Sequence, residues 1–355
     1  MKVQFQVVPH LLKFRFEAGT SRGSFTEKET WFIKAKNGNT VGIGEASPLK
    51  GLSDDYCTDY EEKLKAILDA IAVLEIPETP LEVLDFVKEN VSSDFPSIRF
   101  GLETALLDLT QGGNHLIFDT DFYQGNYRMP INGLIWMGDE SFMREQVAEK
   151  LKAGFNTIKM KVGAINFDRE LSILEAIRAE YSANEITLRV DANGAFHAHD
   201  VEEKLMQLAA LDIHSIEQPV AIGQSELMAK LCASGVLPIA LDEELIGVHE
   251  LAEKEQLLRG INPQYIILKP SLVGGIQSCI EWIDIAESMN IGWWMTSMLE
   301  SNVGLNAIAQ FTAQYKPTLP QGLGTGQLYH NNIASPLEIR KGELLYNSPL
   351  DWQSI

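Results

Sequence analysis

The sequence predicts an α/β barrel that follows a smaller α+β domain. Its 355 residues are enough for two such units. Residues 1 to about 113 pass from alternating β-type segments to a helical pattern, whereas from about residue 130 short apolar strands alternate with amphipathic helices. In that second part, charged residues recur at intervals of about one strand and one helix, the rhythm of a barrel whose strands are parallel.

The N-terminal part is predicted to be an α+β domain over residues 1–125. The segments "KVQFQVV" (2–8) and "TWFIKAK" (30–36) alternate as strands do, and "KNGNT" (36–40) reads as a turn before "VGIGEA". Two later segments, 60–74 and 97–113, place apolar residues at three- and four-residue spacing, and the second ends in a glycine pair suited to a helix C-terminus. Residues 330–355 form a tail that can pack back on this domain.

Residues 126–330 are predicted to form the barrel. Eight strands are expected, at 130–136, 157–162, 186–192, 214–220, 237–243, 265–271, 292–298 and 319–324. Between them, 167–181 and 275–289 have the spacing of amphipathic helices, because apolar side chains fall on one stripe. Alternating strands and helices predict a parallel sheet, and eight strands close it into a barrel.

Composition excludes several classes of function. The net charge of −20 argues against a nucleic-acid partner, since phosphate binding needs clustered Lys and Arg. No apolar run approaches the roughly 20 residues of a membrane span, and the first residues lack a secretory pattern. The three cysteines are widely spaced and form no CxxC, which is typical of a reduced cytoplasm. We therefore expect a cytoplasmic enzyme for a small molecule, with homo-oligomers left open.

Five strands carry charged residues near their C-terminal ends. They are Lys159 and Lys161, Asp191, Glu217, Asp242 and Lys269, and from Lys161 onward they are spaced by 30, 26, 25 and 27 residues. The residue before each of the last five is apolar, namely Met160, Val190, Ile216, Leu241 and Leu268. Because alternate side chains of a strand share a face, this pattern predicts that the charged groups point into the barrel. Turn signals such as "DANG" and "KPS" follow them, which predicts a site at the C-terminal face.

Charges inside a barrel need partners or a metal ion. Three carboxylates on neighbouring strands suit a hard cation with oxygen ligands, in the first place Mg²⁺ and in the second Mn²⁺. Such a cation and nearby ammonium groups stabilise the enediolate that forms when a proton leaves the carbon next to a carboxylate. Lys161 is the predicted base, and repulsion from Lys159 is expected to lower its pKa. Alternation also directs Glu244 inward with Asp242, so that strand alternation alone does not choose between these two carboxylates as the third metal ligand.

Together, KxK (159–161), DAN (191–193), EQP (217–219), DE (242–243) and KPS (269–271) resemble the motifs of the enolase superfamily in its muconate-lactonizing subgroup. The resemblance covers nearly the whole chain, and it implies an N-terminal capping domain and a modified (β/α)7β barrel. It also implies that Asp191, Glu217 and Asp242 bind Mg²⁺, and that Lys161 and Lys269 flank the substrate.

Within the subgroup, three further stretches look like the o-succinylbenzoate synthases: "GEASPLKGLSD" (44–54), "ILKPSLVGG" (267–275) and "SMLESNVGLNAIAQ" (297–310). This resemblance implies dehydration of 2-succinyl-6-hydroxy-2,4-cyclohexadiene-1-carboxylate in menaquinone synthesis. Lys161 is then expected to remove the proton and Lys269 to lie over the enediolate. Loops 17–25 and 46–55 are expected to close over the substrate. The expected substrate contacts are Arg189, Asn193, Ser271, Thr296 and Ser297.

Three other functions were considered. A racemase or epimerase of the same subgroup, acting on N-acylamino acids or dipeptides, needs the same lysines. Dipeptide epimerases usually carry DxD in the last strand, and "QGLGTGQLYH" (321–330) has no carboxylate. His197 and His199 form an HxH that could bind Zn²⁺ in a hydrolase, but they fall in a predicted loop and are expected at the surface. A barrel kept only for binding is disfavoured because no metal ligand or lysine is missing.

Overall fold

The computed structural model describes residues 1–20, 23–163 and 166–355. The N-terminal part is an antiparallel sheet in the order β1 (Gln4–Thr20), β2 (Gly23–Asn37) and β3 (Thr40–Ala46). The turn between β2 and β3 confirms the predicted hairpin, and Gly38 has a φ of 58° there. The predicted loop 17–25 is instead mostly strand, because β1 and β2 extend to Thr20 and from Gly23; residues 21–22 of that loop lie outside the described residues.

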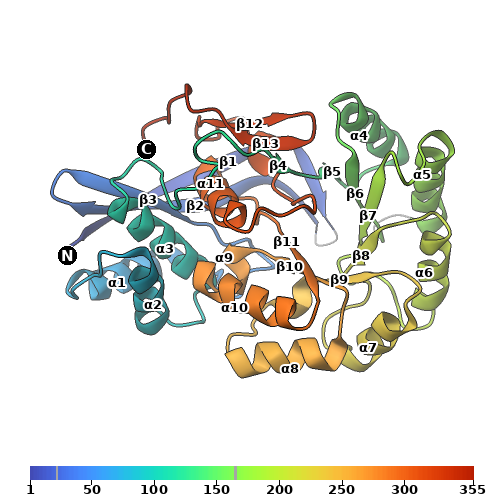
Figure 1. Ribbon diagram of the computed structural model, residues 1–355, viewed down its shortest axis with the longest axis horizontal. Coiled ribbons are helices and arrows are strands. Elements are labelled where there is room, and N and C mark those ends of the chain that lie inside the picture. The colour runs from blue at the N-terminus through green and yellow to red at the C-terminus, as the bar shows by residue number, and fades with distance from the viewer. Residues whose placement is uncertain (21–22, 164–165) are drawn as a thin grey trace.

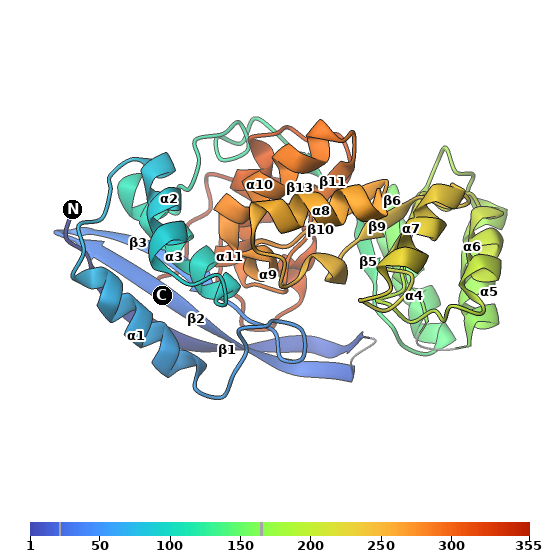
Figure 2. The same ribbon diagram turned by 90° about the horizontal axis from the view of Figure 1, so that it is seen from below.

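Three helices follow, α1 (Tyr60–Ala72), α2 (Pro80–Asn90) and α3 (Pro96–Thr110), and α3 packs directly on β3. The contact is so close that a Cβ at Gly44 would lie 2.0 Å from the Gly101 carbonyl oxygen. As predicted, α3 ends before a glycine pair: the Gly113 amide donates to the Asp108 carbonyl at 2.8 Å. Figures 1 and 2 show these helices beside the sheet.

The second part contains a curled parallel sheet of seven strands. Neighbours in the sheet are neighbours in sequence, and the strands are β5 (Gly133–Ile135), β6 (Thr157–Lys161), β7 (Thr187–Asp191), β8 (Ser215–Glu217), β9 (Ile239–Leu241), β10 (Tyr265–Leu268) and β11 (Gly292–Met295). Each lies inside a predicted strand and is shorter than predicted. The predicted eighth strand forms only isolated bridges, in which Gln321 pairs with Ile131 and Gly322 with Thr296. These bridges join the two edges of the sheet.

Helices lie outside the parallel sheet, as Figures 1 and 2 show. Those of the predicted pattern include α5 (Phe167–Glu180) and α10 (Gly275–Ser288), both within a few residues of the expected bounds. The remaining helices of this part are α4 (Glu140–Lys152), α6 (Val201–Ala209), α7 (Ser225–Ser234), α8 (Leu251–Ile261), α9 (Pro270–Val273) and α11 (Asn302–Ala313), with short 3₁₀ helices η1 (Glu243–Leu245) and η2 (Thr325–Gln327). The fold is therefore α/β, with an antiparallel sheet at its N-terminus.

The C-terminal segment returns to both parts of the chain. The hairpin of β12 (Leu337–Arg340) and β13 (Glu343–Tyr346) pairs with β4 (Met129–Pro130). Beyond it, Trp352 stacks on His115 with ring centroids 4.0 Å apart, and Ile355 packs against the cluster that contains Phe32 of β2. The last residues thus cover the N-terminal sheet.

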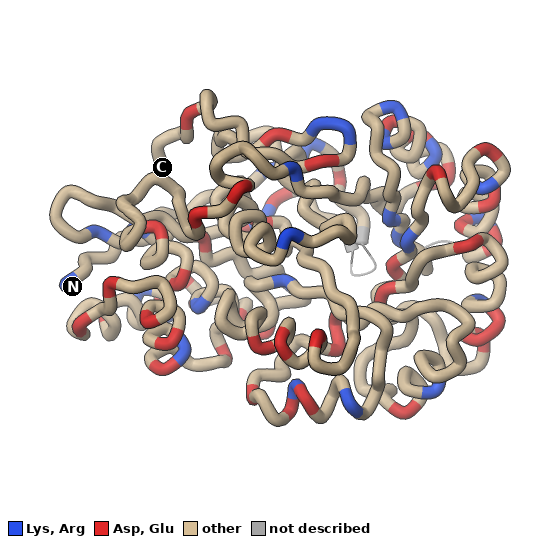
Figure 3. Tube along the Cα trace, in the orientation of Figure 1, with Lys and Arg blue, Asp and Glu red and all other residues tan. Residues whose placement is uncertain are grey.

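Acidic residues are spread over the outer helices of both parts, as Figure 3 shows. In the described ranges, no helix combines the length and the apolar character that crossing a membrane requires.

Candidate active site at the ends of the parallel strands

The charged strand residues meet because the strands are in register. Lys161 lies beside Asp191, and Asp191 beside Glu217, in adjacent strands β6, β7 and β8. The five apolar residues that precede the charged ones are all fully buried, as the predicted alternation requires: Met160, Val190, Ile216, Leu241 and Leu268. The charged side chains of these strands therefore share one side of the sheet.

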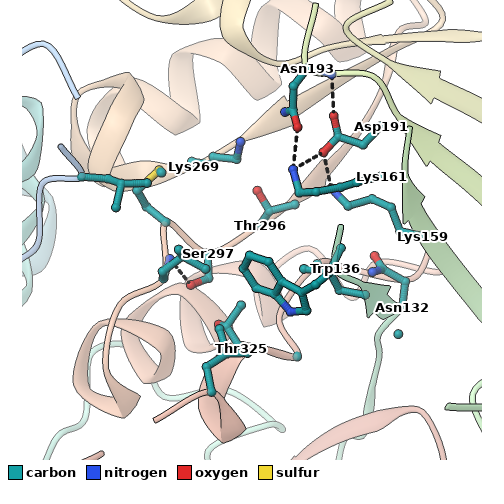
Figure 4. A pocket seen from close by; sticks show the side chains of 18 of the residues that line it. Asn132, Trp136, Lys159, Lys161, Asp191, Asn193, Lys269, Thr296, Ser297 and Thr325 are labelled. Atoms are coloured by element: carbon teal, nitrogen blue, oxygen red, sulfur yellow. Dashed lines mark hydrogen bonds and ion pairs between the residues drawn. The ribbon is translucent and has the colours of Figure 1, made fainter. Parts of the chain in front are cut away.

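A cavity lies above this group of charges. Its polar lining comes from the strand ends, and in Figure 4 Lys269 enters from the side opposite to Lys159 and Lys161. Its other wall comes from the N-terminal part, which supplies Phe25 of β2 and the loop after β3. The lining that matters for the chemistry is Lys50, Trp136, Lys159, Lys161, Asp191, Asn193, Glu243, Lys269, Thr296, Ser297 and Met298.

Three lysines are ion-paired to the carboxylates, and Lys159 connects two of them. Lys159 Nζ donates to Glu217 Oε2 at 2.6 Å and to Asp191 Oδ2 at 3.4 Å. Lys161 Nζ donates to the same Asp191 oxygen at 3.1 Å and to Asn193 Oδ1 at 2.6 Å. On the other side, Lys269 Nζ contacts Asp242 Oδ1 at 2.7 Å. Because Asp191 lies between Lys159 and Lys161, its charge offsets the repulsion that the sequence predicts between them.

Burial and mutual charge shift the acid–base properties of this group. Burial lowers the pKa of Lys159, but the charges of Glu217 and Asp191 outweigh it and raise the pKa above its usual value. Burial raises the pKa of Glu217 to about 7; the Lys159 charge lowers it, while the charges of Asp191 and Asp242 raise it further. The three carboxylates therefore lie close enough to repel one another, and a cation among them would relieve that repulsion.

The carboxylates of Asp191, Glu217 and Asp242 offer the oxygen ligands that a hard cation prefers, but their oxygens do not surround a common position. Over the described ranges, no group of three His, Cys, Asp or Glu residues is placed to hold a metal ion. Instead, Lys159, Lys161 and Lys269 contact oxygens of these carboxylates. One oxygen remains available, because Glu217 Oε1 is buried and has no hydrogen-bond partner in the described structure. Oxygen ligands of this kind suit Mg²⁺.

The prediction that Glu244 points inward with Asp242 is wrong. β9 ends at Leu241 and the 3₁₀ helix η1 starts at Glu243, so strand alternation no longer applies there. Glu243 lines the cavity and accepts from Asn193 Nδ2 at 2.9 Å. Glu244 turns away and accepts from Gln218 Nε2 at 3.0 Å.

The expected substrate contacts divide into two groups. Asn193, Thr296 and Ser297 line the cavity. Arg189 does not: it lies one layer deeper on β7, donates to the Pro320 carbonyl at 2.8 Å and stacks on the Trp294 ring at 4.1 Å. Ser271 is also absent from the lining, because the chain becomes helical at Pro270 and turns this hydroxyl to the Glu300 carboxylate, 2.6 Å away. The structure thus gives Arg189 and Ser271 supporting positions.

Trp136 and Glu300 were missed by sequence reasoning. Trp136 lines the cavity together with Asn132 and Leu134, at alternate positions of one predicted strand. That alternation was a usable signal. Glu300 is fully buried behind Ser297, in the connection from β11 to α11, where no periodicity marks a buried acid. His197 and His199 lie at the surface, as expected, in the connection from β7 to α6.

Comparison with known proteins decides the family. Residues 142–348 match the model of the enolase C-terminal domain-like family. The chain belongs to this family. It is 45% identical to the o-succinylbenzoate synthase of Desulfotalea psychrophila over 94% of this chain and 96% of that protein. The crystal structure of MenC from Desulfotalea psychrophila LSv54 superposes with a TM-score of 0.87 at 41% identity, covering 97% of this chain and all of the other.

A more distant relative carries the name of a different activity. The N-succinyl-L-Arg/Lys racemase of Bacillus cereus is 26% identical over 81% of this chain and 77% of that protein.

Proposed function

We propose that the chain is an o-succinylbenzoate synthase, a lyase that dehydrates 2-succinyl-6-hydroxy-2,4-cyclohexadiene-1-carboxylate to o-succinylbenzoate. The observation that carries this proposal is 45% identity over nearly the full length of both chains to an enzyme of that name. The cavity supports it, because two sets of lysines face a carboxylate cluster from opposite sides. We place the reaction in menaquinone synthesis and in the cytoplasm; the free thiols of Cys57, Cys232 and Cys279 agree with the second point.

Lys161 is the proposed acid–base residue. Its Nζ takes the proton from the carbon next to the ring carboxylate, and the electron pair of the broken C–H bond moves into an enediolate. That pair then returns to form the ring double bond as the neighbouring hydroxyl leaves. Lys161 gives its proton to the departing hydroxide, so that water is the second product. Between the steps, Lys269 holds a positive charge over the opposite face.

Asp191, Glu217 and Asp242 are the residues that would hold Mg²⁺, or Mn²⁺ in its place. When bound, the ion supplies positive charge for the two oxygens of an enediolate. Lys159 then keeps the carboxylates oriented, since its ammonium group is held by Glu217 and Asp191. Asn193 positions Lys161 through its side-chain oxygen. A substrate carboxylate would find a donor at Thr296; Ser297 also lines the cavity, but its hydroxyl donates to Glu300.

A racemase acting on N-acylamino acids is the alternative. The racemase from Bacillus cereus and a hydrophobic dipeptide epimerase from Enterococcus faecalis are both 26% identical to this chain, so identity does not separate the two activities. Dipeptide epimerization is disfavoured because residues 321–330 lack the expected carboxylates. Inversion would also use one lysine on each face of the substrate, Lys161 and Lys269. The two activities must therefore be distinguished by testing which substrate the protein turns over.

The deciding experiment assays purified protein with Mg²⁺ on the cyclohexadiene carboxylate and, in parallel, on N-succinylamino acids in ²H₂O. We expect fast formation of o-succinylbenzoate, loss of activity with a chelator and its return with Mg²⁺ or Mn²⁺. Fast inversion with solvent deuterium at the α-carbon, and no dehydration, would establish the racemase instead. Full dehydration after exhaustive chelation would refute the metal requirement.

A further inference from the structure

A buried polar cluster links the N-terminal sheet to the rim of the parallel sheet. We call it the rim cluster. It consists of residues from β2, from β3 with the residue after it, and from the connection between β11 and α11: Lys28, Thr30, Glu45, Ser47, Glu300 and Ser301, all buried. Most of it lies behind the cavity wall, and none of these six residues lines the cavity itself.

Glu45 anchors β3 to the start of α11. Its Oε2 accepts from the Gly304 amide at 2.8 Å and from Ser301 Oγ at 2.6 Å, and its Oε1 accepts from the Ser301 amide at 2.9 Å. Thr30 Oγ1 adds a fourth hydrogen bond at 2.8 Å. A carboxylate at the amino end of a helix is well stabilised, so this anchor is firm.

Glu300 fixes part of the cavity wall. One of its oxygens accepts from the Ser297 hydroxyl and from the Met298 amide, both at 2.6 Å, and the other accepts from Ser271 Oγ at 2.6 Å. Ser297 and Met298 line the cavity. Any movement of the Glu300 carboxylate therefore moves the wall directly.

Lys28 lies two residues before Thr30 on the same face of β2, and Thr30 donates to Glu45, so the Lys28 side chain faces the rim cluster. Only 4% of it is exposed. Its Nζ donates to the Ser47 carbonyl at 3.2 Å and to the Ser47 hydroxyl. Burial lowers the pKa of Lys28, while the charges of Glu300 and then Glu45 raise it. Ser47 begins the loop whose residues Leu49 and Lys50 line the cavity from the N-terminal side.

We propose that Lys28 is a positioning residue. It holds the loop after β3 through Ser47, and its charge holds the Glu300 carboxylate, which fixes Ser297 and Met298 in the opposite wall. Lys28 thereby sets the distance between the two sides of the cavity. It touches no substrate. Removing its charge would leave two buried carboxylates facing each other, and Glu300 would release Ser297 and Met298. Since the cavity is the substrate site only if the proposed function holds, the kinetic part of this inference depends on it.

Hydrogen–deuterium exchange tests the inference without any substrate. The variants are Lys28→Met, Glu300→Gln and the double variant that combines these two substitutions and so removes one positive and one negative charge. The control is Lys254→Met. Lys254, like Lys28, is a buried lysine that does not line the cavity; its ion pair is with Glu281, at 2.6 Å. In Lys28→Met we expect faster exchange in both segments 46–55 and 296–301. The control should leave both segments unchanged.

Coupling is read from the double variant. If Lys28 acts through Glu300, exchange of 296–301 in the double variant is no faster than in Glu300→Gln alone. Faster exchange in the double variant, or unchanged exchange of 296–301 in folded Lys28→Met, would overturn the inference. If Lys28→Met does not fold, the comparison of the double variant with Glu300→Gln decides alone.

Kinetics add a second readout. We expect Lys28→Met to raise KM for the cyclohexadiene about tenfold and to change kcat less than about threefold, because the wall binds substrate and moves no proton. An unchanged KM in the folded variant contradicts positioning. A wild-type protein that does not dehydrate this compound refutes the proposed function, while the exchange result still decides the role of Lys28.

Discussion

Two neighbouring hydroxyls at the end of β11 differ in what they can offer a ligand. The Ser297 hydroxyl donates its hydrogen bond to the Glu300 carboxylate, 2.6 Å away. Thr296 Oγ1 has no hydrogen-bond partner in the described structure, and in Figure 4 it points toward Lys161. An unpaired buried hydroxyl gains most from a charged partner. Of the two predicted donors, Thr296 is therefore the one available to a substrate carboxylate.

Thr296→Val keeps the shape of the side chain and removes the hydroxyl. Because a hydrogen bond to a charged group contributes about 1.5–3 kcal/mol, we expect KM to rise by roughly 10- to 100-fold. Ser297→Ala should change KM less and lower the melting temperature more, since it removes one of the three hydrogen-bond donors to the buried Glu300 carboxylate. Steady-state kinetics and thermal unfolding measure both, and the reverse ranking of KM would contradict the assignment.

Lys161→Ala tests the acid–base role. Acid–base groups supply about 10²–10⁴ in rate, so we expect kcat to fall at least 100-fold while the fold is kept. Lys150→Ala is the matched control, because Lys150 also lines the cavity but lies on α4, away from the carboxylates. Circular dichroism checks the fold. Normal turnover by folded Lys161→Ala would remove this residue from its proposed role.

At this scale, strand alternation predicted the orientation of charged residues where a strand actually continues. Lys159, Lys161 and Asp191 are within β6 and β7, and all three line the cavity. Alternation failed at Glu244, because a 3₁₀ helix begins just before it. The resemblance placed Ser271 at the substrate, but an α-helix begins just before it and turns its hydroxyl to Glu300. Alternation also does not show how far along the barrel axis a side chain lies. Arg189 therefore faces inward as predicted, yet it lies beneath the cavity rather than in its lining.

Among the elements, the contact of α3 with β3 depends on glycine. Gly42 and Gly44 lie on the same face of β3, and a Cβ at either would meet the backbone of α3 within 2.3 Å. Such an approach leaves no room for any side chain. It buries nearly all of α3, from Pro96 to Leu109.

Gly44→Ala should therefore be strongly destabilising. The new Cβ would lie 2.0 Å from a carbonyl oxygen that cannot turn away, and overpacking of this kind costs about 3 kcal/mol or more. Gly260→Ala in α8 is the control: no atom lies within 4 Å of its Cβ, and alanine favours the helix by up to about 1 kcal/mol. Urea unfolding compares them. Equal stability of the two variants would show that α3 can move off the sheet.

Sequence periodicity located most elements but not their lengths. The two helices predicted within the barrel agree with α5 and α10 because each has one clear apolar stripe. The described residues of the expected loop 17–25 proved to be strand, since no signal in residues 17–20 marks where the long β1 ends. The segment 319–324 was predicted as a full strand, yet it closes the barrel through isolated bridges alone.

Considered as a whole, the molecule holds its two parts together with buried carboxylates. Glu45 of β3 caps α11, and Glu103 of α3 accepts from the first amides of α10, at 2.5 Å from Ile276 and 3.3 Å from Gln277. Sequence periodicity cannot predict such long-range contacts, because each joins residues far apart along the chain. Resemblance of the whole chain to one family predicted the overall arrangement instead.

Glu103 also makes stability depend on pH. Burial raises its pKa from 4.5 to about 8, although the two amide hydrogen bonds lower it. The folded protein therefore binds more protons than the unfolded chain between those values, and the stability that Glu103 contributes at pH 4.5 is lost as pH rises to 8. The shift corresponds to roughly 3–5 kcal/mol. Asp108 acts in the same sense, because burial raises its pKa to about 7, whereas the pKa of His115, lowered to about 4, acts in the opposite sense.

Glu103→Gln isolates this contribution from those of other groups. Gln cannot ionise, so the free energy of unfolding of the variant should rise relative to wild type by roughly 3–5 kcal/mol between pH 4.5 and 8.5. The hydrogen bond that Gln fails to accept adds a constant offset and no pH dependence. Urea unfolding at five pH values measures the difference, with Glu78→Gln, an exposed acid, as control. A pH-independent difference would mean that Glu103 stays ionised in the folded protein, and that the junction of α3 and α10 tolerates a buried charge.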